Sequence, residues 1–210
     1  MSEIEKFYSL LDSKSESKVQ EGLQLWSELD KAAHDKFVGE WQAWVDLFRV
    51  SLCWYLAKHG RFVINCAGKE LTELPALPSA LQRLDCNNNK LTALPALPDT
   101  LQILRCENNR LTALPTLPDT LQMLWCENNR LTALPALPSA LQRLDCQNNK
   151  LTALPTLPEA LQILGCYDNQ LTALPTLPST LKRLYCENNR LTEKPITPEG
   201  CYLSFYPQRA

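Results

Sequence analysis

The sequence predicts an α+β fold, in which a repeat solenoid with a curved parallel β-sheet on its concave face follows an α-helical N-terminal cap domain. From Leu71 onward the chain repeats every 20 residues, and such a period indicates a solenoid. Before residue 60 the apolar residues instead recur at helical spacing. We therefore divide the chain into a helical domain at 1–60, repeats at 61–200 and a C-terminal capping segment at 201–210.

The first 60 residues carry three apolar stripes with the three- and four-residue spacing of amphipathic helices. The stripes begin at Ile4, Val19 and Phe37, and the third one reaches Leu56. Gly60 fits the stop that commonly follows a helix. These features predict three helices whose aromatic residues form a core and which cover the first coil of the repeats.

Each repeat unit reads LTxLPxLPxxLQxLxCxNNx. Six units span 71–190, and a seventh begins at Leu191 and decays. Leu84 and Cys86 are two residues apart, so they point to one side of a short strand and into the core, whereas residues 83, 85 and 87 point outward. The LPxLP run cannot be helical, because proline removes amide donors and favours extended neighbours. This pattern predicts leucine-rich repeats with extended connections on the convex side.

Two ladders of identical residues run through the units. One asparagine per unit marks the end of the strand, where a short amide can bond free backbone groups of its own and the next coil: Asn89, Asn109, Asn129, Asn149, Asn169 and Asn189. Seven cysteines share the inward phase: Cys66, Cys86, Cys106, Cys126, Cys146, Cys166 and Cys186. Thiols buried among apolar groups are inert. We expect them to be reduced and unreactive, which favours a cytoplasmic location.

Both ends of the solenoid depart from the repeat. Residues 61–70 align with the strand half of a unit, and Ile64 and Cys66 fall on its two inward positions. We expect a zeroth strand there. In the seventh unit Lys194 and Thr197 replace inward leucines. This change predicts a divergent closing coil.

Charge and composition exclude several classes of partner. The formal net charge is −2, so no strong field draws the chain to nucleic acid or to an anionic membrane. The sequence contains no apolar run of about 18 residues and no apolar stretch near Met1 typical of a signal peptide. We expect a cytoplasmic monomer that binds no nucleic acid and spans no membrane. A signal-peptide-independent route into a host cytosol stays open.

The LPxLPxxLxxLxCxxN unit resembles the bacterial LPX subclass of leucine-rich repeats, found in the YopM-like and IpaH-like effectors that pathogens deliver by type III secretion. The resemblance covers 61–200 and implies a helical segment before the repeats. In the IpaH-like branch a helical E3 ubiquitin ligase domain with a Cys-x-Asp active site follows the repeats. This chain ends at Ala210, soon after its last well-matched repeat at Arg190, so we expect no ligase domain.

The sequence offers little for catalysis. One Cys-x-Asp occurs at Cys166 and Asp168, but Cys166 lies on the buried phase, where a thiol is a poor nucleophile. The histidines, His34 and His59, lie in the helical region, and no CxxC, HExxH or Gly-rich phosphate loop occurs. A threonine row that starts at Thr72 has the spacing of ice-binding solenoids, but a turn hydrogen bond explains it more simply. We predict no catalytic residue, no metal and no cofactor.

Variation between units is concentrated at the outward strand positions, while the LPxLP half hardly changes. Solenoids bind partners on the extended concave face, and tryptophan, methionine and arginine are enriched in interfaces. We predict that Trp125, with its ring facing water, is the centre of a site for a partner protein. The predicted partner-binding residues are Ile103, Arg105, Met123, Trp125, Arg143, Asp145, Ile163, Tyr167, Arg183 and Tyr185.

The favoured function is therefore that of a protein-binding module without catalytic activity, in the role of a bacterial effector. The alternatives are the substrate-recognition part of an IpaH-like E3 ubiquitin ligase effector without its catalytic domain, and a structural or ice-binding solenoid. The variation on the sheet face is also compatible with tolerated drift on a solvated surface. We expect Glu107, Glu127 and Glu187 to be solvated charges at the rim, each worth little to stability.

Overall fold

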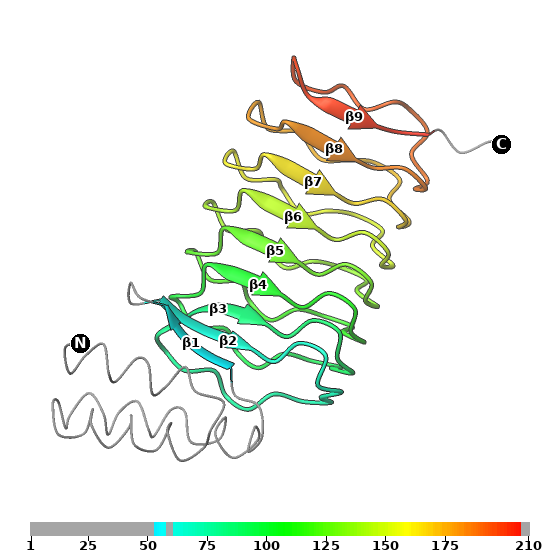
Figure 1. The fold of residues 1–210 in the computed structure, drawn as a ribbon. Helices are drawn as coiled ribbons and strands as arrows, with labels where there is room; N and C mark the ends of the chain where they lie inside the picture. Colours follow the sequence, from blue (N-terminus) through cyan, green and yellow to red (C-terminus); the bar gives the residue numbers. More distant parts are fainter. Residues whose placement is uncertain (1–52, 58–60, 207–210) are drawn as a thin grey trace, which may run out of the picture.

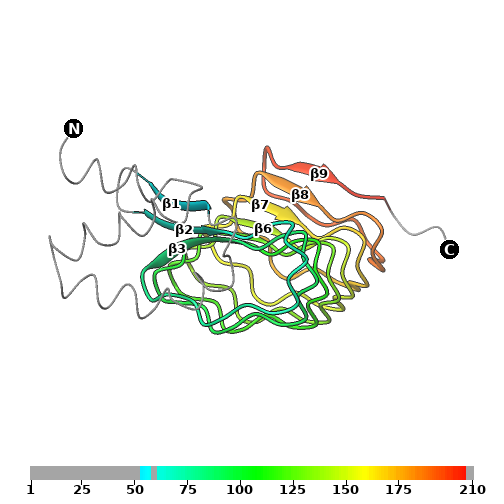
Figure 2. The same cartoon turned by 60° about the horizontal axis from the view of Figure 1, so that its bottom comes forward.

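The computed structural model of the chain describes residues 53–57 and 61–206. Within them, successive coils stack along one axis and contribute to a single nine-stranded sheet whose strand order follows the sequence (Figure 1). Figure 2 shows the coils closer to end on, with the strands along one side of each coil and the loops along the other. The strands are β1 (Cys53–Ala57), β2 (Arg61–Asn65), β3 (Leu81–Asp85), β4 (Ile103–Arg105), β5 (Met123–Trp125), β6 (Arg143–Asp145), β7 (Ile163–Gly165), β8 (Arg183–Tyr185) and β9 (Tyr202–Ser204).

The register of the sheet joins equivalent positions of neighbouring repeats. From β2 to β9 the strands are parallel, and between β3 and β8 each residue faces the one 20 positions further on, as Leu104 faces Leu124. The residues expected to form a zeroth strand lie in β2, where Ile64 faces Leu84. A side chain therefore has its counterparts from the adjacent coils as its direct neighbours.

Leucine and cysteine fill the interior of every coil. Leu81, Leu84 and Cys86 of the first unit and Leu91 at the start of the second are fully buried, and the same four positions are buried at each 20-residue step up to Leu191. The two leucines of each LPxLP run pack against this core from the loop side. Burying one leucine side chain contributes about 1.5–3 kcal/mol, so the core that extends over all coils is the main source of stability.

The asparagine ladder satisfies the backbone groups at the strand ends. Asn129 donates from Nδ2 to the carbonyl oxygens of Cys106 at 3.0 Å and Cys126 at 3.1 Å, and its Oδ1 accepts from the amide of Leu111 at 2.9 Å. Each ladder asparagine from Asn89 to Asn189 bonds the corresponding carbonyls. Besides its own coil, each asparagine bonds the preceding coil. From the sequence, a bond to the next coil was expected.

The expected α+β class is wrong. The described residues form a β-solenoid with no helix, and Tyr55 and Leu56, expected at the end of the third helix, lie in β1. This strand pairs antiparallel with β2, Trp54 facing Ile64, and so bonds backbone groups that would otherwise form a free sheet edge. A short apolar run fits helix and strand periodicity alike, which explains the error. The other residues of the expected helices lie outside the described residues, and no described helix could cross a membrane.

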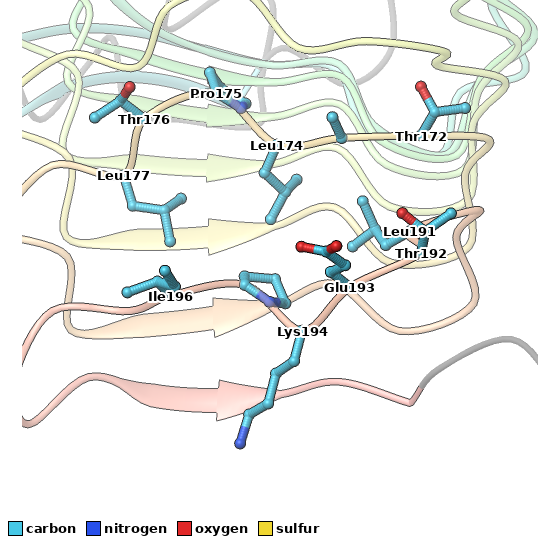
Figure 3. A pocket seen from close by; sticks show the side chains of 12 residues that line it. Thr172, Leu174, Pro175, Thr176, Leu177, Leu191, Thr192, Glu193, Lys194 and Ile196 are labelled. Atoms are coloured by element: carbon cyan, nitrogen blue, oxygen red, sulfur yellow. The ribbon is translucent and has the colours of Figure 1, made fainter.

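The seventh coil, expected to be divergent, leaves a hollow against its neighbour. A hollow of about 570 Å³ lies between it and the sixth coil. Figure 3 shows Leu174 and Leu177 directed toward the seventh coil, while the Lys194 side chain points away. Ile196, on the seventh coil, is 93% exposed. The loss of the inward leucines thus loosens the stacking at this end, which β9 closes by pairing with β8.

Replacing Asn129 by alanine tests the ladder. The substitution leaves the carbonyls of Cys106 and Cys126 and the amide of Leu111 without their side-chain partner. We expect the free energy of unfolding in urea to fall by about 2–4 kcal/mol, because buried backbone groups lose their hydrogen bonds. Thr132→Ala, at an exposed position of the next coil, should change it by less than about 0.5 kcal/mol. Equal effects of the two substitutions would show that the ladder is not needed.

Candidate functional site

The outward side chains of the strands form one continuous surface. We use the name "sheet face" for the surface formed by the outward positions of β3 to β8 and by the residue two positions past each of these strands. In β5, Leu124 is fully buried while Met123 and Trp125 on either side are half-buried. The predicted strand phase is therefore confirmed at the centre of the candidate site.

Trp125 lies between two arginines. It faces Arg105 of β4 and Asp145 of β6 in the register of the sheet. The guanidinium carbon of Arg105 is 5.6 Å from the centroid of the indole ring, and that of Arg143 is 5.2 Å from it. Both distances are within the range of cation–π attraction. The ring is thus held by both neighbouring coils, whereas the sequence analysis expected it to face water.

Each of these arginines is in turn fixed by a carboxylate two residues further along the chain. Arg143 donates from Nε to Asp145 at 2.6 Å, and Arg105 donates from Nη2 to Glu107 at 2.7 Å. Asp145 and Glu107 are 6% and 5% exposed, so both pairs are partly withdrawn from water. Charge-assisted hydrogen bonds of this kind restrict side-chain rotation. Trp125 is therefore flanked by guanidinium groups that are already in place.

Gly165 of β7 makes room for Asp145. A Cβ atom at this position would lie 2.7 Å from Asp145 Oδ1 and 2.9 Å from Gln147 Oε1. Since real Cβ atoms essentially never come so close to another atom, any other residue here would displace the carboxylate that holds Arg143. The sequence alone does not indicate a role for Gly165, because its effect depends on side chains of the preceding coil.

A row of acidic and amide side chains follows the strands. Glu107, Glu127 and Gln147 occupy the same position of three consecutive units, two residues past β4, β5 and β6. In each, one side-chain oxygen is buried and has no hydrogen-bond partner among the described residues: Glu107 Oε2, Glu127 Oε2 and Gln147 Oε1. Glu107 pairs with Arg105. The expectation that Glu107 is a solvated rim charge is therefore wrong.

The surroundings of Glu127 favour its neutral form. The pKa of the Glu127 carboxyl is raised to about 7. Burial is the largest cause, the nearby charges of Glu107 and Asp145 also raise this pKa, and a backbone hydrogen bond and Arg105 lower it. The two carboxylates beside it each have an arginine partner. Within the described chain Glu127 has none. Near neutral pH, the loss of a proton from Glu127 therefore adds one negative charge to the sheet face.

The structure divides the predicted site residues into two groups. The first group lies together on β4, β5 and β6 around the indole ring: Ile103, Arg105, Met123, Trp125, Arg143 and Asp145. The second group lies on or after β7 and β8, toward the C-terminal end: Ile163, Tyr167, Arg183 and Tyr185. In that group the ring of Tyr185 packs at 5.7 Å from that of Tyr202 on β9. We therefore take the first group as the centre of the candidate site.

The cysteine ladder lies on the opposite side of the sheet from this site. All seven ladder cysteines are buried and free, as expected. Burial raises the pKa of Cys66 and of Cys186 to about 12, and that of Cys166, the cysteine of the Cys-x-Asp sequence, well above its ordinary value. The described residues contain no group of three or more histidine, cysteine, aspartate or glutamate side chains able to hold a metal ion.

The coil stacking, the register and the asparagine ladder together define a leucine-rich-repeat protein. Residues 119–159 match the family model described as leucine-rich repeats in two copies. No curated protein sequence matches the chain at a significant level. The assignment to leucine-rich-repeat proteins therefore depends on the repeats themselves and on their structure.

Solved structures of bacterial effectors have a similar fold. YopM from Yersinia enterocolitica WA-314 is 36% identical, with a TM-score of 0.65, over 70% of this chain and 33% of that one. YopM from Yersinia pestis, described as a leucine-rich effector protein, is 32% identical, with a TM-score of 0.65, over 87% and 51%. A Shigella effector LRR domain is 30% identical, with a TM-score of 0.62, over 77% and 69%. The chain thus spans a third and about half of the two YopM chains.

The pKa of Glu127 leads to a prediction about stability. Its folded value of about 7 exceeds the ordinary 4.5, so its contribution to stability is fully present below pH 4.5 and is lost as the pH rises through 7. Glu127→Gln removes the titrating group and keeps its shape. We expect the variant to equal the wild type at pH 4.5 and to be more stable by about 1 kcal/mol at pH 8, a figure reduced for partial solvent exposure.

Urea unfolding at the two pH values measures this difference. Glu159→Gln, which changes an exposed carboxylate, is the matched control and should show no such pH dependence. If the free energies of unfolding of Glu127→Gln and the wild type differ by the same amount from pH 4.5 to pH 8, the pKa of Glu127 is not raised on folding and the prediction is wrong.

Proposed function

We propose that this chain binds a partner protein through the sheet face of β4, β5 and β6, with Trp125 at the centre of the interface. The observation that carries the proposal is the indole ring of Trp125 lying between the guanidinium groups of Arg105 and Arg143. Tryptophan and arginine dominate the binding energy of protein interfaces. The similarity to effector leucine-rich-repeat proteins supports an interaction module.

The fixed geometry of these side chains favours tight binding. Arg105 and Arg143 are held by Glu107 and Asp145 before any partner arrives, so little rotational freedom remains to be lost on association. Ile103 and Met123 lie half-buried next to Trp125 and Arg105 on the same strands and add apolar area. An aromatic centre with apolar and charged neighbours is the usual composition of a binding hot spot.

We propose further that the chain has no catalytic activity and serves as a bacterial effector that acts in a host cytosol. The raised pKa of the buried Cys166 thiol argues against its use as a nucleophile. Similarity to two YopM proteins supports the effector role. A second candidate is the recognition part of an E3 ligase effector, which the LPxLP repeat pattern favours; the similarity over 69% of a Shigella effector LRR domain supports an effector repeat domain. In both roles the sheet face holds the partner.

Substituting Trp125 by alanine tests the binding site. The partner is first recovered by affinity capture on the wild-type chain, and its dissociation constant is then measured by calorimetry. We expect Trp125→Ala to weaken binding by roughly 30-fold or more, because a central aromatic is lost from a desolvated interface. The free energy of unfolding should fall by about 1–2 kcal/mol, since two cation–π contacts are lost.

Thr116→Ala is the control, because Thr116 is exposed on a connection outside the sheet. It should leave both the affinity and the stability unchanged. If folded Trp125→Ala binds as tightly as the wild type, the partner contacts another surface and the proposal is wrong.

A further inference from the structure

The sheet face differs chemically across its width. Along β4 and β5 the first outward position is apolar, with Ile103 and Met123, and the second carries Arg105 and Trp125. The position two residues past each strand is acidic in both units, with Glu107 and Glu127. Because the strands are in register, these positions form an apolar row and an acidic row on opposite sides of Trp125.

The acidic row contains buried oxygen atoms without a hydrogen-bond partner in the described part of the chain. Glu107 is only 5% exposed, and its Oε2 atom has no partner, as is also true of Glu127 Oε2 and Gln147 Oε1 within the described chain. Buried polar atoms in folded proteins nearly always have a partner. These oxygens are buried, and the buried Arg105 Nε beside them is a donor that also lacks a partner among the described residues, so they do not by themselves require a donor from outside the chain. The need for an outside cation follows from the charges of the site.

The charges of the site also lack one cation. Arg105 pairs with Glu107 and Arg143 pairs with Asp145, while Glu127 has no cationic partner among the described residues. The five side chains thus comprise three carboxylates and two guanidinium groups. An added ammonium or guanidinium group would balance the third carboxylate, whereas an added carboxylate would increase the repulsion.

We infer that the acidic row binds a lysine or arginine side chain of the partner, whose nitrogen donates to the carboxylate of Glu127 while its aliphatic stem lies along Trp125. This inference rests on the proposed function and adds the chemistry of the partner to it. A segment that crosses the strands would then place apolar residues on Ile103 and Met123 and its cationic residue on the acidic row. The partner segment is thus basic on one side and apolar on the other.

Binding of the cation should depend on the protonation of Glu127. The charged and titratable groups near this carboxyl on the sheet face are Glu107 and Arg105 of the preceding coil, Asp145 of the following coil and the phenol of Tyr167, and the thiols of Cys106, Cys126 and Cys146 lie across the sheet from it. Burial raises the pKa of these thiols and of Tyr167, so they stay neutral, while the pKa of Glu127 is about 7. When Glu127 loses its proton it is repelled by Glu107 and can turn toward the partner's cation.

A displayed library of random 12-residue peptides, selected against the full chain at pH 7.5, provides the test. We expect enriched peptides to combine lysine or arginine with apolar residues. In a synthetic peptide from this set, replacing arginine by citrulline or lysine by norleucine should weaken binding at least tenfold, as should Glu127→Gln in the protein. Glu159→Gln, at an exposed carboxylate outside the sheet, should have no effect.

The pH dependence gives a second readout that a merely structural role of Glu127 would not produce. The dissociation constant of the basic peptide should fall about tenfold from pH 6 to pH 8, because only the charged form of Glu127 binds the cation. With Glu127→Gln it should be nearly constant over this range. Binding of the peptide to the wild type with no pH dependence would overturn the inference.

The remaining outcomes separate this inference from the proposed function. The enriched peptides could be neutral or acidic, and their binding could depend on Trp125 but not on Glu127. In that case the sheet face binds partners, as proposed, but the inference that the partner places a cationic residue on the acidic row is wrong. If no peptide is enriched, or if neither Trp125→Ala nor Glu127→Gln weakens binding, both the inference and the proposed function are overturned.

Discussion

The hydrogen bonds that each ladder asparagine makes to two coils are the interaction on which the rest of the structure depends. A single coil cannot bury its leucines alone, so it folds only against a neighbour. Asn109, which bonds the carbonyls of both Cys86 and Cys106, joins one coil to the one before it at the point where the strand ends. The register of the sheet, and with it every contact between coils, follows from this connection.

The candidate site is a consequence of that register. Trp125 meets Arg105 because their positions differ by the length of one repeat, and Arg143 reaches the same ring from the next coil. Each of these contacts is weak by itself, about 0.5–1 kcal/mol for an exposed cation–π pair. Since the backbone already holds the strands together, the side chains need only small energies to adopt one arrangement. The same register places Glu127 next to Glu107 and so creates the unpaired carboxylate.

The sequence predicted the parts of the fold that repeat. Ile64 and Cys66 identified β2, and the inward phase of Leu124 placed Trp125 outward. It did not predict β1, because the residues from Cys53 to Ala57 have no repeated partner to establish their periodicity, and strand pairing with β2 decides their structure. An isolated apolar run is compatible with more than one element until its tertiary partner is known.

The details of the site could not be predicted for a different reason. Trp125, Arg105 and Arg143 were identified because outward positions can be read from the strand phase. The burial of Glu107 and the need for glycine at position 165 depend on how side chains of neighbouring coils share space. Such packing depends on which residues stand next to one another on neighbouring coils. A repeat pattern describes each position separately and therefore does not reveal it.

Photo-cross-linking from two faces of the folded chain tests the central claim most directly. A photoreactive phenylalanine analogue would replace Met123 on the sheet face in one variant and the exposed Thr116, outside the sheet, in the other. With the captured partner, the account predicts a cross-linked complex from position 123 that excess unlabelled wild-type chain abolishes, and none from position 116. A complex formed from position 116 alone would contradict it.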